Sequence, residues 1–192
     1  MLSACLCPHS YKCSRRQLRI DQCSESHSRR IINLNLDFPL FLTRAFLPQL
    51  RRVSQSTGPV EVVFIGSLAG ESSIPFLCTY SASKSFLKRA AFILREDERA
   101  LHGPNLSFMY LNVAQVRSST LTGDPSLAKP LADEFAKSVV GSLGCGRRVV
   151  VPWYFHHFLT GIMSLFPESL CEYFARAGAR GVMKNVDRPK DQ

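Results

Sequence analysis

Residues 60–84 decide the fold and read VEVVFIGSLAGESSIPFLCTYSASK. The stretch begins with an apolar, β-branched run from Val60 to Ile65, which a glycine and a serine terminate. A run of this length and composition predicts a buried strand of a parallel sheet. Tyr80 then opens a helix that extends to about Leu101, where a His-Gly-Pro sequence ends it. Strand, loop and long helix together indicate an α/β fold.

The rest of the chain continues this alternation. Residues 31–52 have apolar residues at helical spacing, and Pro39 inside them predicts a kink or a late start of that helix. Residues 106–113 and 148–151 predict two further strands, and residues 133–143 predict a short helix. Strands that alternate with helices predict βαβ units, with right-handed crossovers that place helices on both faces of a parallel sheet.

Tyr80 and Lys84 carry the chemistry of the quoted stretch. Positions i and i+4 share a helix face, so the ammonium group of Lys84 lies near the Tyr80 phenol and favours its ionised form. Such a phenol exchanges a proton with a carbonyl or hydroxyl oxygen. Ser67 directly follows the first strand, where α/β sheets bind ligands and where a hydroxyl can donate to an oxyanion. The alternative is structural: Ser67 caps a turn, and Tyr80 precedes a solvated lysine.

In this context the segment GSLAGESSIPFLCTYSASKSFLKRA resembles the active-site segment of the short-chain dehydrogenase/reductase family. The preceding helix is similar to the family's N-x(7)-T-x(4)-P pattern, with Asn35, Thr43 and Pro48 at the three positions. The resemblance implies a Rossmann-like, doubly wound parallel sheet and a nicotinamide cofactor, NADP(H) or NAD(H).

The resemblance also implies the roles of individual residues. Asn35 is the relay asparagine, Ser67 polarises the carbonyl, Tyr80 is the acid and base, and Lys84 activates Tyr80 and contacts the nicotinamide ribose. The loop after the second strand has Val116 and Ser118 where the family's P-G-x-V-x-T motif contacts the cofactor, although the Pro-Gly pair is absent.

The carboxyl-terminal part is similar to the branch of the family that acts on steroids and long-chain 3-oxoacyl thioesters. That resemblance implies reduction of a ketone with NADPH, a lipid-like carbonyl or alcohol substrate, and a location at the endoplasmic reticulum membrane or in the cytoplasm. Residues 149–166 carry no charge. They predict a strand and then an apolar helix that lies on a membrane surface or covers a substrate cavity, rather than a membrane span.

Three parts are expected along the chain: an unstructured leader over 1–30, a Rossmann-like part over 31–152, and an apolar helical tail over 153–192. The family's glycine-rich T-G-x-x-x-G-x-G loop is absent, and 34 residues precede Asn35 where the fold needs about 90. We therefore expect the carboxyl-terminal part of an N-terminally truncated sheet. Two functions stay open: a reductase, or a non-catalytic partial module that acts through a protein partner, a second copy or a membrane.

Composition excludes several other classes. The formal net charge is +9, but residues 1–30 and 176–192 hold +4 and +3 of it. This distribution argues against a nucleic-acid-binding face on the folded body. The seven cysteines form no C-x-x-C pair, which argues against a metal site and favours reduced thiols. The first 30 residues lack the continuous apolar core of a signal peptide, so we do not expect secretion.

Overall fold

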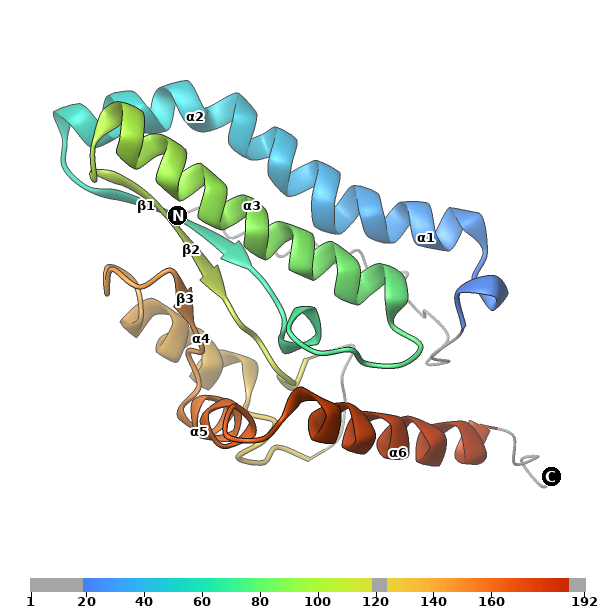
Figure 1. The fold of residues 1–192 in the computed structure, drawn as a ribbon. Helices are drawn as coiled ribbons and strands as arrows, with labels where there is room; N and C mark the ends of the chain where they lie inside the picture. The colour runs from blue at the N-terminus through green and yellow to red at the C-terminus, as the bar shows by residue number, and fades with distance from the viewer. Residues whose placement is uncertain (1–18, 119–123, 187–192) are drawn as a thin grey trace.

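The computed structural model describes residues 19–118 and 124–186 and has an α/β architecture around a parallel sheet (Figure 1). The strands are β1 (Val60–Ile65), β2 (Leu106–Leu111) and β3 (Val149–Val150), in the spatial order β1-β2-β3. Val60 pairs with Leu106, and this register continues to the end of both strands. The three predicted strands and their parallel arrangement are therefore confirmed.

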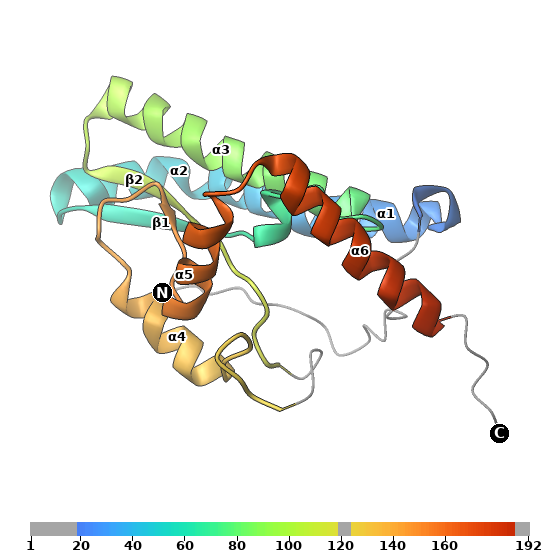
Figure 2. The same cartoon turned by 60° about the horizontal axis from the view of Figure 1, so that its bottom comes forward.

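Two long helices, α2 (Phe38–Ser56) and α3 (Cys78–His102), lie side by side over one face of the sheet. The helices α4 (Ala132–Gly141) and α5 (Tyr154–Met163) lie on the opposite side of the strands (Figures 1 and 2). Alternate strand residues pack against α3 and form the core with it. The core consists of Phe64, Leu106, Phe108 and Tyr110 from the strands and of Leu87 and Ala91 from α3. The sequence predicted helices on both faces, and the structure confirms them.

The burial of β1 differs from the prediction of a buried strand. Only Phe64 in this strand is fully buried, and 52% of the surface of Ile65 is exposed. Among the described residues β1 pairs with β2 alone, so its other edge has no strand beside it. An edge strand keeps solvent access that the apolar composition of a single segment cannot reveal.

The helix before β1 is interrupted, as Pro39 predicted. α1 (Glu25–Ile32) leads into a π-helical turn, Asn33–Asp37, and α2 starts at Phe38. Proline has no N–H, so the Asn35 carbonyl, four residues earlier, lacks its α-helical donor. The wider turn accommodates this loss.

The expected leader needs a correction over its described part. Residues 1–18 lie outside the described residues, but α1 begins at Glu25, within the stretch expected to be unstructured. Ser24 caps this helix by accepting a hydrogen bond from the His27 amide at 3.2 Å, and Arg29 pairs with Glu25 one turn away. A cap and an i,i+4 ion pair stabilise a helix that carries few apolar residues.

The described part of the carboxyl-terminal tail contains two helices, α5 and α6 (Glu168–Val186). Among the residues that the structure describes, no helix is long and apolar enough to cross a membrane. The two helices and the turn between them expose large apolar side chains, among them Tyr154, Phe158, Leu165, Phe166 and Phe174.

Candidate functional site

Ser67 lies directly after β1 and starts a 3₁₀ turn, Leu68–Gly70. Its Oγ accepts a hydrogen bond from the Ala69 amide at 3.2 Å, so the capping role considered for this serine is real. Capping uses a lone pair and leaves the hydroxyl proton available. Within residues 19–118 and 124–186, Ser67 Oγ donates to no acceptor, and it can therefore donate to a ligand oxygen.

Tyr80 and Lys84 share a face in the first turns of α3. The Lys84 Nζ lies 5.8 Å from the centroid of the Tyr80 ring, within the range of a cation–π contact. Lys84 Nζ also donates to the Ile65 carbonyl at 2.9 Å, which brings it to the carboxyl end of β1. The described part of the chain provides no hydrogen-bond partner for the Tyr80 hydroxyl.

Asn35 reaches this site through an intermediate residue. Its side-chain amide donates to Ser83 Oγ at 3.3 Å, and Ser83 Oγ donates to the Tyr80 carbonyl at 2.7 Å. Asn35 therefore contacts α3 beside Tyr80 and Lys84 but makes no hydrogen bond to either side chain. The signal for its local structure is Pro39, because residue 39 leaves the Asn35 carbonyl without its helical donor.

The remaining sequence predictions concern cofactor and metal. Val116, which is half-buried, and Ser118, which is exposed, lie in the loop after β2, and their cofactor contacts stay predictions. The described residues contain no cluster of three His, Cys, Asp or Glu side chains that could hold a metal ion. His156 is buried instead, and its Nε2 lies 3.0 Å from the Ala128 carbonyl.

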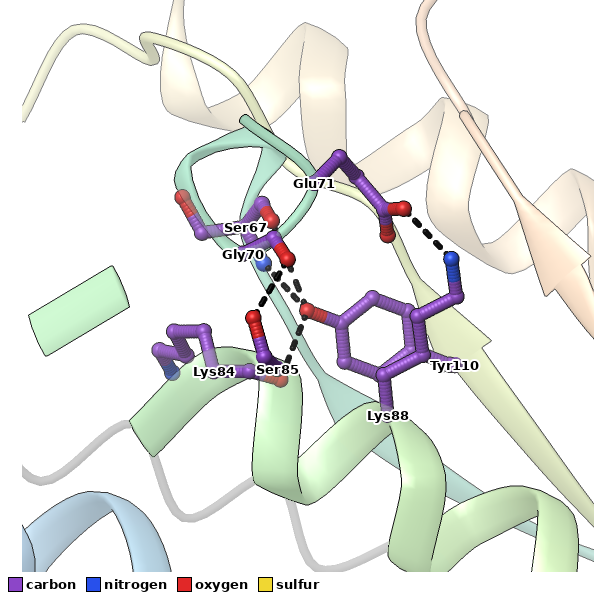
Figure 3. A network of polar contacts seen from close by, with 7 residues as sticks. All are labelled: Ser67, Gly70, Glu71, Lys84, Ser85, Lys88 and Tyr110. Atoms are coloured by element: carbon purple, nitrogen blue, oxygen red, sulfur yellow. Dashed lines mark hydrogen bonds and ion pairs between the residues drawn. The ribbon is translucent and has the colours of Figure 1, made fainter. Parts of the chain in front are cut away.

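Sequence analysis missed Tyr110, a fully buried residue of β2 (Figure 3). Its hydroxyl accepts a hydrogen bond from the Ser67 amide at 3.0 Å and lies 3.2 Å from the Lys84 carbonyl. Burial raises the pKa of Tyr110 to about 12, although the hydrogen bond from Ser67 opposes that increase. Nearby Glu71 and Tyr80 raise the pKa further, so this phenol stays neutral at physiological pH.

Gly66 makes room for the Tyr110 ring. A Cβ atom at residue 66 would lie 1.9 Å from Cζ of Tyr110, far inside contact distance. The glycine between β1 and Ser67 was a sequence signal for this close approach, because a glycine that ends a strand often marks one. Its partner could not be read from the sequence, since the two residues are 44 positions apart.

The conformations of the described glycines bear on the glycine-rich loop that the sequence lacks. Those with positive φ are Gly58, Gly103, Gly144 and Gly146, and each precedes a strand. A dinucleotide pyrophosphate needs a glycine turn that leads from a strand into a helix. Among the described residues, no glycine with positive φ forms such a turn.

Known proteins with similar sequences belong to one family. Residues 14–102 match the family model described as short chain dehydrogenase. A very-long-chain 3-oxoacyl-CoA reductase from Kluyveromyces lactis is 29% identical over 88% of this chain and 52% of its own length. The chain thus spans about half the length of the curated relatives it matches.

Solved structures show the same fold. A short chain dehydrogenase from Burkholderia cenocepacia, in complex with NADP, superposes with a TM-score of 0.62 at 17% identity, over 78% of this chain and 60% of its own. A 3-ketoacyl-(acyl-carrier-protein) reductase from Brucella melitensis, complexed with NADH, gives 0.60 at 14% identity, over 70% and 59%. The predicted Rossmann-like arrangement is therefore confirmed for this chain.

Proposed function

Because the chain belongs to the short-chain dehydrogenase/reductase family, we propose that Ser67, Tyr80 and Lys84 form a site for reduction of a ketone by a nicotinamide cofactor. The observation that carries the proposal is the arrangement of side chains in the first two turns of α3. There a phenol without a hydrogen-bond partner among the described residues lies one turn from an ammonium group. Ser67 offers its hydroxyl proton at the end of β1, beside the same helix.

Each side chain has a separate task in this chemistry. The Ser67 hydroxyl donates to the ketone oxygen and stabilises the charge that develops there. Tyr80 transfers its phenolic proton to the same oxygen, and the Lys84 ammonium stabilises the phenolate that remains. A bound reduced nicotinamide supplies the hydride to the ketone carbon. The products are a secondary alcohol and the oxidised cofactor, and Asn35 supports the helix through Ser83.

The cofactor that we propose is NADP(H), with NAD(H) as the alternative. Tyr80 and Lys84 are suited to its nicotinamide riboside end, and Val116 and Ser118 are the proposed contacts in the loop after β2. The absence of a strand-to-helix glycine turn from the described residues limits this fit to one end of the dinucleotide.

The substrate class that we propose is a lipid-like ketone, either a 3-oxoacyl thioester or a steroid. Support comes from the relatives, which are very-long-chain 3-oxoacyl-CoA reductases. Support also comes from the apolar side chains that α5, α6 and the turn between them expose. Some of these side chains line a hollow, which is formed by Met163, Phe166, Leu170, Cys171 and Phe174. A location at the surface of the endoplasmic reticulum membrane or in the cytoplasm agrees with such a substrate.

The test is turnover of a long-chain 3-oxoacyl-CoA and of a ketosteroid, followed by the loss of reduced-nicotinamide absorbance. Tyr80→Phe removes the transferred proton and keeps the ring, so the rate should fall about 100-fold or more while NADPH still binds. Tyr154→Phe is the matched control, because this tyrosine lies on exposed α5. Equal rates for wild type and Tyr80→Phe would refute the assignment of the acid.

The second function is a non-catalytic module that acts through a protein partner, a second copy of the chain or a membrane. The edge of β1 favours it, because within the described residues no strand covers this edge and Ile65 is half exposed. Light scattering together with NADPH titration separates the two functions. A monomer that binds NADPH excludes the module, whereas a dimer or vesicle-bound chain without NADPH affinity excludes the reductase.

A further inference from the structure

We propose that Tyr110 is a positioning residue, whose buried hydroxyl holds the backbone of Ser67 and the backbone of Lys84 in one fixed relation. The proposal deepens the proposed function, because these two residues carry the hydroxyl and the ammonium group of that site. Tyr110 comes from a third element, β2, and its hydroxyl lies between the loop after β1 and helix α3 (Figure 3).

The Tyr110 hydroxyl both accepts and donates a hydrogen bond. A phenol has one proton to donate and can accept from a neighbouring N–H. Tyr110 accepts from the Ser67 amide at 3.0 Å, and two carbonyls compete for its proton, Lys84 at 3.2 Å and Ser67 at 3.4 Å. Both carbonyls also accept a backbone N–H, Ser67 from the Gly70 amide and Lys84 from the following turn of α3, so the shorter distance makes the Lys84 carbonyl the better acceptor.

The Ser67 amide needs this partner because the sheet does not provide one. The amides on either side, at Gly66 and Leu68, donate to the carbonyls of Leu111 and Val113 in and after β2. In a parallel pair, alternate residues face the neighbouring strand, so the amide of Ser67 points away from β2. A part-buried N–H without a partner is costly, and the Tyr110 hydroxyl removes that cost.

Other contacts of the described residues join the end of β1 and the loop after it to α3, and they lie nearer to solvent. Lys84 Nζ donates to the Ile65 carbonyl. Ser85 Oγ donates to the Gly70 carbonyl, and Lys88 pairs with Glu71 (Figure 3). Surface contacts between long side chains contribute little to rigidity. The Tyr110 hydroxyl is buried and attached to a stiff ring in the centre of the sheet, so it fixes the geometry that the exposed contacts only support.

Tyr110→Phe tests the proposal, because it deletes the hydroxyl and keeps the ring beside Gly66. In the wild-type chain, hydrogen exchange at the Ser67 amide should be as slow as in β2, although Ser67 lies in a loop. In Tyr110→Phe that amide should exchange about tenfold faster, while the Phe108 amide on the same strand does not change. Tyr154→Phe, which removes an exposed hydroxyl from α5, should leave both amides unchanged.

Turnover provides the second readout. With Ser67 and Lys84 misplaced, kcat should fall about tenfold, and the KM for NADPH should rise because Lys84 is also a proposed contact of the cofactor. Phe108→Leu, a variant of the same strand without a hydroxyl to lose, should reduce the melting temperature and keep kcat.

The outcomes are distinct. Fast exchange at Ser67 in the wild-type chain overturns the proposal, even if Tyr110→Phe does not fold. Unchanged Ser67 exchange in a folded Tyr110→Phe chain overturns it as well. If Ser67 exchange accelerates as expected while the wild-type chain reduces no ketone, the positioning contact is supported and only the proposed reductase function fails.

Discussion

Gly66→Ala should destabilise the chain strongly, because the new Cβ would lie 1.9 Å from Cζ of the Tyr110 ring. Carbon atoms in contact are separated by about 3.5–4.0 Å, so the ring would have to retreat by about 1.6–2.1 Å. Tyr110 is 0% exposed and lies in the central strand, which leaves no space for that movement.

The expected magnitude has two parts. Overpacking of a filled core costs about 1–3 kcal/mol, and the displaced hydroxyl loses its bonds to Ser67 and Lys84 at about 1 kcal/mol each. The free energy of unfolding should therefore fall by about 3–5 kcal/mol. Urea unfolding followed by circular dichroism measures this change.

A matched glycine provides the control. A Cβ atom at Gly161, in exposed helix α5, meets nothing within 4 Å, so Gly161→Ala should stabilise the chain by about 0.5–1 kcal/mol. Tyr110→Ala should cost less in the Gly66→Ala background than in the wild-type chain, because there it also removes the clashing ring. A loss below about 1 kcal/mol for Gly66→Ala would refute the packing argument.

Two further predictions concern the helices that carry the site. Glu98 is 1% exposed, and its carboxylate accepts hydrogen bonds from two nitrogens of the Arg51 guanidinium group. These hydrogen bonds hold the pKa of Glu98 below its ordinary value. The pair therefore stabilises the fold at neutral pH and loses this contribution as the pH falls through the titration range of Glu98. Arg51→Met leaves the buried Glu98 carboxylate without its partner and should lower the free energy of unfolding at pH 7. The loss should be about 2–4 kcal/mol, since Arg51 is 32% exposed and solvent screens part of its effect. An unchanged acid limb of the pH–stability curve in this variant would contradict the prediction. Pro39→Ala provides an N–H for the Asn35 carbonyl, so the π-helical turn should become α-helical and the free energy of unfolding should rise by about 1 kcal/mol. Nuclear magnetic resonance should then show loss of the Asn35 contact to α3. A retained π turn would show that Pro39 is not its cause.

Local signals explain why much of the fold was predictable. The β1 bounds match the predicted strand, because Gly66 and Ser67 follow a β-branched run. The long helix ends where expected because Gly103, at a φ of 84°, terminates it and Pro104 follows. The Tyr80–Lys84 spacing needs only a helix to place both residues on one face.

The unpredicted features depend on contacts distant in sequence. In the sequence, Tyr110 is one more large side chain of an apolar strand. Only the folded sheet brings its hydroxyl to Ser67, 43 residues earlier in the chain. The edge position of β1 depends on which strands are present beside it, which its own composition does not encode. α1 was missed because its few apolar residues give no helical periodicity, although Ser24 is a strong capping residue.

Saturation-transfer nuclear magnetic resonance with NADPH tests most directly whether Tyr80 and Lys84 form a nicotinamide site. The account predicts transfer from the chain to the nicotinamide and adjoining ribose protons, stronger than to the adenine protons, and a large loss of that transfer in Lys84→Met. Absence of transfer to the wild-type chain, or equal transfer to Lys84→Met, would contradict the account.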